Sequence, residues 1–211
     1  MKQDLASNSL CGYLCSGCGK SSLLRIIGGL WASDSGSISR PVSIGRGGIF
    51  FVPQRPYITV GSLRQQLLYP HTLEEQQELD TQLESIVKLV GLEYLLARFG
   101  LDKPADWADI LSGGEQQRLG FARLLYHRPV FAVMDEATSA LDEALQERCL
   151  RACNAAQITM INVAHRSSVI GFHERILSFV APGIFEVTEN ECQPGKLMTF
   201  PDKVDSLRGQ L

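Results

Sequence analysis

The sequence has no long hydrophobic run, little net charge and no regular framework of cysteines. Its 211 residues carry 20 basic and 23 acidic side chains, which leave a net charge of −3. That charge is too small, and of the wrong sign, for a surface that binds nucleic acid. No apolar stretch approaches the roughly 18–20 residues needed to cross a bilayer, and residues 1–8 lack the apolar segment of a signal peptide. Because 45% of the residues are hydrophobic, the sequence predicts one soluble α/β domain.

The six cysteines do not form the even framework of a small secreted protein, and we expect a reducing compartment. Cys11, Cys15 and Cys18 have the spacing that holds an iron–sulfur cluster in radical-SAM enzymes. However, the residue before Cys18 is Gly17 rather than an aromatic residue, and Cys18 also belongs to a stronger motif. We therefore keep the cluster as the minor interpretation and coincidental spacing as the main one.

Hydrophobic patterning predicts alternating strands and helices, and hence a sheet with helices packed on it. We expect a helix over 20–30, a short strand at 37–39, and buried strands at 49–52, 131–134 and 159–164. Between them, the pattern predicts an almost wholly helical segment over 62–108. One apolar face of that segment is expected from residues at helical spacing, which are Leu79, Leu83, Ile86, Val87 and Val90.

A glycine-rich turn that runs into a helix is the first candidate site. In Gly17-Cys18-Gly19-Lys20-Ser21-Ser22, backbone N–H groups could converge on a phosphate at the helix N-terminus. Lys20 could then reach the β- and γ-phosphates, and the Ser21 hydroxyl could ligate Mg²⁺. Leu14 stands where the P-loop rule expects glycine, and a leucine at positive φ would cost about 1–2 kcal/mol. An ordinary glycine turn before a helix is the alternative.

Two carboxylates follow the buried strand expected at 131–134. Asp135 is placed to bind the hydration shell of Mg²⁺, and Glu136 to polarise an attacking water as a general base. The alternative is a helix N-terminus, where acidic residues interact favourably with the helix dipole.

Residues 111–118, Leu-Ser-Gly-Gly-Glu-Gln-Gln-Arg, predict a second anion site. Ser112 is suited to cap a helix, and Glu115 three residues later completes a capping box. Gly113 and Gly114 leave N–H groups unshielded at the start of that helix. This segment resembles the signature sequence of ATP-binding cassette proteins.

The other elements of that family follow in the family's order. Gln54 resembles the Q-loop glutamine, which links Mg²⁺ and the attacking water to the transmembrane partner. Asp142 resembles the D-loop residue that crosses the dimer interface, and His165 resembles the switch histidine that contacts the γ-phosphate. As lone residues these would more often be structural, but their order and spacing favour the cassette.

Further segments resemble subfamily D of these transporters, and the resemblance covers about residues 14–188. The segments are 27–31, 51–57, 63–70, 98–100, 105–107, 165–168 and 172–175. The resemblance implies a half-transporter of a peroxisomal, lysosomal, plastid or bacterial membrane, with the cassette facing the cytoplasm or the organelle stroma. The cargoes that it implies are fatty acids or their CoA esters, cobalamin, or peptides.

The resemblance also implies an organisation. A P-loop NTPase core over 1–188 would contain a helical signature subdomain over about 62–125, and a polar tail would occupy 189–211. The antiparallel β-subdomain that opens a cassette is expected to be largely missing, because only 16 residues precede Gly17. Tyr13 stands too close to the phosphate loop to be the aromatic residue that stacks on adenine. The transmembrane domain is expected in the full-length protein or in a partner.

The implied activity is ATP hydrolysis with Mg²⁺, coupled to transport. We expect catalysis by Lys20, Gln54, Glu136 and His165, and Mg²⁺ ligation by Ser21, Gln54 and Asp135. One chain would bind ATP through its phosphate loop, and a second cassette, the same or a related chain, would close over it. The residues implied in ATP binding are Gly17, Cys18, Gly19, Lys20, Ser21 and Ser22 on one side and Ser112, Gly113, Gly114, Glu115 and Asp142 on the other.

Two alternatives to a transport ATPase remain at this stage. The chain could be a degenerate or fragmentary cassette that acts only as a non-catalytic binding or regulatory module. It could instead be a soluble cassette protein that works on DNA or ribosomes. The sequence shows no long coiled coil, second cassette or basic face, so no nucleic-acid partner is expected.

Overall fold

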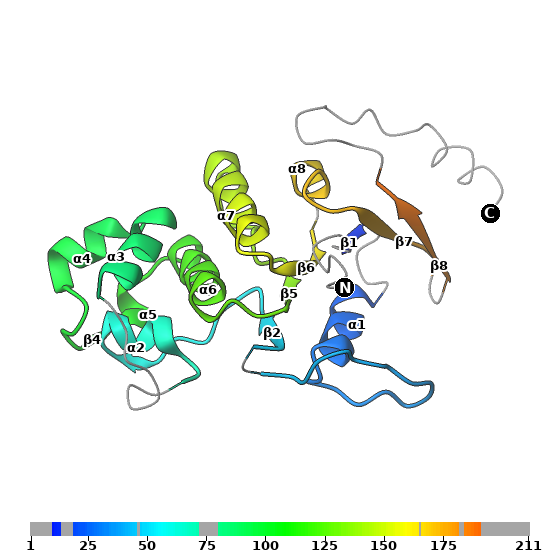
Figure 1. The fold of residues 1–211 in the computed structure, drawn as a ribbon, viewed down its shortest axis with the longest axis horizontal. Coiled ribbons are helices and arrows are strands. Elements are labelled where there is room, and N and C mark those ends of the chain that lie inside the picture. The colour runs from blue at the N-terminus through cyan, green and yellow to red at the C-terminus, as the bar shows by residue number, and fades with distance from the viewer. Residues whose placement is uncertain are drawn as a thin grey trace, which may run out of the picture.

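A computed structural model of the chain describes residues 10–13, 19–45, 47–71, 80–164, 166–181 and 184–190. Its main feature is a six-stranded sheet in the order β2-β5-β6-β1-β7-β8 (Figure 1). Every neighbouring pair is parallel except the last, β7 and β8, which is antiparallel. The expected α/β class is therefore confirmed.

The elements have the following bounds. The strands of the main sheet are β1 (Leu10–Tyr13), β2 (Ile49–Val52), β5 (Phe131–Asp135), β6 (Thr159–Val163), β7 (Arg175–Ala181) and β8 (Ile184–Glu189). A separate antiparallel pair joins β3 (Val60–Gly61) to β4 (Ala105–Asp106). The helices are α1 (Lys20–Ile27), α2 (Leu63–Leu68), α3 (Asp80–Leu89), α4 (Glu93–Phe99), α5 (Trp107–Ile110), α6 (Gly113–His127), α7 (Glu143–Ala155) and α8 (Ser167–Ile170).

The two faces of the sheet are covered by different helices, α1 on one side and α7 and α8 on the other (Figure 1). Side chains alternate between the two faces of a strand. On β5, Val133 packs with Leu24 of α1, while the next residue, Met134, belongs to the larger core that includes Leu150 of α7. Burial on both faces explains the continuous apolar run of β5, from Phe131 to Met134.

Helices α2 to α5 gather at one end of the molecule, together with β3 and β4 (Figure 1). The apolar face expected there is confirmed for Leu83, Ile86, Val87 and Val90, which are all buried, whereas Leu79 lies outside the described residues. The side chain of Trp107 is also buried, and its Nε1–H donates to the carbonyl of Gly61 at 2.7 Å. The described residues 62–71 and 80–108 are mainly helical as expected, although β4 interrupts them.

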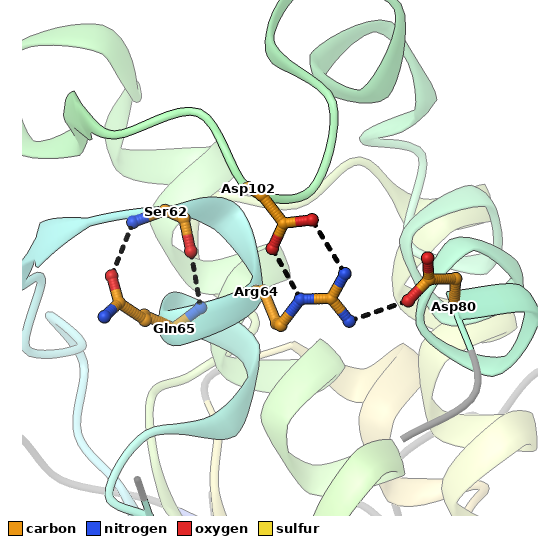
Figure 2. Close-up of polar contacts among 5 residues, drawn as sticks. All are labelled: Ser62, Arg64, Gln65, Asp80 and Asp102. Carbon is orange, nitrogen blue, oxygen red and sulfur yellow. Dashed lines mark hydrogen bonds and ion pairs between the residues drawn. The ribbon is translucent and has the colours of Figure 1, made fainter. Parts of the chain in front are cut away.

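Arg64 links three parts of this helical group (Figure 2). Its guanidinium donates to both carboxylate oxygens of Asp102, at 2.6 and 2.9 Å, and to Asp80 at 2.8 Å. Beside it, Ser62 and Gln65 form a capping box that starts α2. Arg64 also holds the pKa of Asp102 below its usual range. Both carboxylates are more than half exposed, so each ion pair stabilises the fold by no more than about 1 kcal/mol.

Two expectations about strands are wrong. Residues 37–39 form no strand, because they pair with no neighbour and the side chain of Ile38 is 38% exposed. The β7–β8 hairpin was not expected, although its first strand carries Ile176, which packs against the main core, and Leu177, which is buried. The polar tail predicted past Glu189 lies outside the described residues, apart from Asn190.

Of the three cysteines in the iron–sulfur interpretation, the structure describes only Cys11, and Cys15 and Cys18 lie outside the described residues. Cys11 gives that interpretation no support. Cys11 is fully buried in β1, where burial raises the pKa of its thiol to about 12. A protonated thiol in the core is poorly suited to bind a metal, because the thiolate is the ligand. Among the helices that the structure describes, none is both long and apolar enough to cross a membrane.

Candidate active site

The start of α1 forms the first part of the candidate site. Gly19, its N-cap, has a φ of 95°, a conformation that glycine adopts without strain. Lys20 follows as a buried residue, and Ser21 and Ser22 are half-buried in the first turn. The first N–H groups of a helix have no partner within it, so this turn offers donors to an anion. Gly17 and Cys18 lie outside the described residues.

Ser21 is joined directly to Asp135, at the carboxyl end of β5. The hydroxyl of Ser21 donates to Oδ1 of Asp135 at 2.8 Å, across a gap of 114 residues in the sequence. Asp135 is 6% exposed. A hydroxyl and a carboxylate are the hard oxygen ligands that Mg²⁺ prefers, so this pair fits the metal that the sequence implies.

Gln54 and Glu136 form a second pair at the same edge of the sheet. Gln54 follows β2 by two residues, and its Nε2 donates to Oε2 of Glu136 at 2.8 Å. Glu136 comes directly after β5 and has a φ of 50°. Its N–H donates to the carbonyl of Val163 at 3.1 Å, at the end of β6. A non-glycine residue held in this region costs about 1–3 kcal/mol and is typical of functional sites.

The second predicted anion site, the cradle formed by Ser112, Gly113 and Gly114, lies at the start of α6. Ser112 is the N-cap, and the capping box with Glu115 is confirmed, since the Ser112 hydroxyl accepts from the Glu115 N–H and Glu115 Oε2 accepts from the Ser112 N–H. Ser112 and Gly113 are exposed, so the first N–H groups of α6 can reach a ligand. A Cβ on Gly114 would lie 3.0 Å from the carbonyl oxygen of Ala140, which explains why a residue without a side chain stands there.

Tyr94 is a neighbour of this cradle that the sequence did not point to. Its hydroxyl donates to Oε1 of Glu115. Burial and that hydrogen bond raise the pKa of Tyr94 to about 12. Burial alone would raise the pKa of Glu115, but the hydrogen bonds from Tyr94 and Ser112 outweigh it and keep that pKa below its usual range. Glu115 is therefore ionised at neutral pH.

The segment after Glu136 leads to Asp142. Asp142 is the exposed N-cap of α7, and its Oδ1 accepts from the N–H of Leu145 at 2.9 Å. Arg166 holds this segment by donating to the carbonyls of Leu141 and Ser139, at 2.5 and 2.9 Å. His165, the predicted switch histidine, lies outside the described residues.

Comparison with known proteins places the chain in a family. Residues 11–139 match the family model described as "ABC transporter". The chain belongs to the ABC transporter family. A bacterial Atm1-family ABC exporter, solved with ATP bound, shares the fold with a TM-score of 0.66 and 24% identity over 82% of this chain and 32% of the exporter. The expected ABC ATPase fold is thus confirmed.

Curated relatives of this cassette belong to subfamily D. It is 46% identical to ABC transporter D family member 1 of Arabidopsis thaliana over 179 residues. That match covers 82% of this chain and 13% of the relative. It is 41% identical over 193 residues to ATP-binding cassette sub-family D member 3 of Rattus norvegicus, covering 88% and 28%. For the lysosomal cobalamin transporter ABCD4 of Homo sapiens, the identity is 43% over 180 residues, covering 82% and 29%. The resemblance to subfamily D is confirmed, and the chain spans less than a third of each relative.

Proposed function

We propose that this chain binds and hydrolyses ATP as the nucleotide-binding part of an ABC half-transporter. The proposal rests on two hydrogen-bonded pairs of side chains, which lie where the strands β2 and β5 end. Ser21 contacts Asp135, and Gln54 contacts Glu136, each at 2.8 Å. These residues come from α1, from the end of β2 and from the end of β5. In open α/β sheets, ligands bind at the carboxyl ends of the parallel strands.

Each side chain has a role that suits its chemistry. Lys20 would neutralise charge on the β- and γ-phosphates, and Ser21 with Asp135 would hold Mg²⁺, which neutralises further charge when bound. Glu136 would take a proton from the attacking water, and Gln54, hydrogen-bonded to the Glu136 carboxylate, would orient that water. His165 is proposed to contact the γ-phosphate.

The exposed start of α6 supports a shared site. Ser112 and Gly113 lie on a different helix from Ser21, and they are open to solvent. We propose that they bind the phosphates of ATP held by a second cassette, with Glu115 and Asp142 beside them. Two-fold symmetry would then create two composite sites, each incomplete in a single chain. The second cassette is a copy of this chain or a related one.

The first test is ATP hydrolysis by the isolated chain. We expect a weak rate per chain that rises with protein concentration, because paired chains complete the sites. A rate per chain that stays flat across a wide concentration range would contradict the shared site.

Equilibrium binding of a labelled ATP analogue separates this function from a non-catalytic module. We expect the parent to bind and Lys20→Ala to bind much more weakly. Binding that needs Lys20 but leads to no hydrolysis at any concentration would favour the non-catalytic module.

We extend the proposal to a transmembrane domain, in the full-length protein or a partner, since the relatives are transporters. Cargo would be chosen by that domain, so fatty acids or acyl-CoA stay a prediction from the resemblance. The membrane, whether peroxisomal, plastid, lysosomal or bacterial, also stays a prediction.

A further inference from the structure

A buried glutamine in α6 contacts three separate segments of the candidate site. Gln117 lies on the same helix as the anion cradle at Ser112, and it is only 4% exposed. Gln117 belongs to the segment 111–118 that resembles the signature sequence, but no local pattern assigns it a role, because its partners are distant in the chain.

The side-chain amide of Gln117 forms hydrogen bonds through both its nitrogen and its oxygen. Its Nε2 lies 3.1 Å from the carbonyl oxygen of Gln54, 3.4 Å from that of Glu136 and 3.0 Å from the hydroxyl of Ser139. An amide nitrogen has two hydrogens, so these three acceptors share two donors. On the other side, Oε1 of Gln117 accepts from the N–H of Ala140 at 2.8 Å.

These contacts hold the main chain of both members of the Gln54–Glu136 pair. The two side chains are hydrogen-bonded to each other, and the two backbone carbonyls both accept from Gln117. Glu136 needs such support, since its φ of 50° is unfavourable for a side-chain-bearing residue and persists only where the surroundings enforce it.

Helix α6 touches the same segment at a second point. Gly114 packs so closely on Ala140 that a Cβ there would lie 3.0 Å from the Ala140 carbonyl oxygen. The start of α6 and residues 136–140 are therefore joined through Gly114 and through Gln117. A displacement of the cradle at Ser112 would act on the main chain of Glu136.

We propose that Gln117 is a positioning residue for hydrolysis, which holds the main chain of Glu136 and Gln54 and fastens the start of α6 to them. The proposal rests on the proposed ATPase function only for its kinetic consequence. Gln117 touches no reacting atom. Its loss should therefore lower kcat and leave the binding of ATP nearly unchanged, because its side chain bonds to residues 54, 136, 139 and 140, whereas Ser21 bonds to Asp135.

The kinetic test compares Gln117→Met with Gln66→Met. Gln66 is a matched control, since it is also a fully buried glutamine with several hydrogen bonds, but its partners are Thr59 and Arg123. Both variants lose similar contacts and keep side-chain volume. We expect kcat to fall about tenfold or more in Gln117→Met, with KM for ATP within about twofold of the parent. We expect Gln66→Met to keep the parent kcat.

A second readout does not depend on hydrolysis. Amide hydrogen exchange in a peptide covering residues 136–141 should be faster in Gln117→Met than in the parent, and unchanged in Gln66→Met. Gln117→Asn, which keeps an amide group but is one carbon shorter, should show exchange between that of Gln117→Met and that of the parent. This variant also serves if Gln117→Met does not fold.

The outcomes separate the two claims. If the parent hydrolyses ATP and Gln117→Met keeps its kcat, the proposal for Gln117 is overturned. Exchange over 136–141 that matches the parent in both Gln117 variants overturns it as well. A parent that hydrolyses no ATP refutes the proposed function alone, because faster exchange confined to the Gln117 variants still supports the positioning role.

Discussion

Burial of His173 predicts that the fold loses stability in mild acid. The residue is 3% exposed, its Nδ1 contacts the carbonyl of Val169 at 3.0 Å, and its Nε2 has no hydrogen-bond partner among the described residues. Protonation would create a buried imidazolium with an unpaired N–H. Burial therefore lowers the pKa of His173 from 6.5 to about 4.

Proton linkage gives the direction and the size of this change in stability. Between about pH 4 and 6.5 the unfolded chain binds a proton at this residue and the folded chain does not, so stability falls as the pH is lowered. From pH 7.5 to 5.0, this one residue should reduce the free energy of unfolding by about 2 kcal/mol. His127, whose pKa is also lowered by burial to about 4, adds a loss of the same sign.

Urea unfolding at pH 7.5 and 5.0, followed by the fluorescence of the buried Trp107, measures this loss. His173→Asn is the comparison, because its amide keeps a donor near the Nδ1 position and does not titrate. The variant should be less stable at pH 7.5 but should lose about 2 kcal/mol less than the parent on acidification. Equal losses in the two proteins would refute this explanation of the pKa of His173.

Two further substitutions test the site and the helical group. Glu136→Gln should lower the rate of ATP hydrolysis by about 10²–10⁴ and preserve or prolong ATP-bound dimers, because it removes the proposed general base and keeps the size of the side chain. Phosphate release and size-exclusion chromatography measure the two effects, and a parental rate would exclude Glu136 as the base. Asp102→Asn should reduce the free energy of urea unfolding by about 1 kcal/mol or less, since the carboxylate that contacts Arg64 is 72% exposed. A loss of several kcal/mol would mean that the pair contributes far more than its exposure suggests.

Local signals in the sequence were sufficient for much of the fold. The strands β2 and β5 are short apolar runs, β6 is apolar apart from Thr159 and Asn162, and the capping box at Ser112 is a pattern within four consecutive residues. The segment at 37–39 forms no strand, because a single isoleucine between serines does not provide a partner strand. The β7–β8 hairpin depends on pairing with β1, which no local pattern reveals.

Motifs pointed to Ser21, Gln54, Asp135 and Glu136, and the structure joins Ser21 to Asp135 and Gln54 to Glu136. Their roles in ATP binding and hydrolysis stay predictions. Gln117 was missed, since its acceptors lie 19 to 63 residues away in the chain and come together only through the sheet.

In the proposed dimer, a phosphate loop on one chain and the cradle at the start of α6 on another complete one site. Lys20→Ala disables the first part. Gly113→Asp disables the second by placing a negative charge at the phosphates, and it fits the chain itself, because a Cβ on Gly113 meets nothing within 4 Å. In a mixed dimer, one composite site carries both substitutions and the other carries neither.

The decisive measurement is therefore ATP hydrolysis by an equal mixture of the two variants. Each variant alone should be inactive, and the mixture should recover up to about a quarter of the parental rate, since half of randomly formed dimers are mixed and each has one intact site. A mixture as inactive as its components would contradict the shared site.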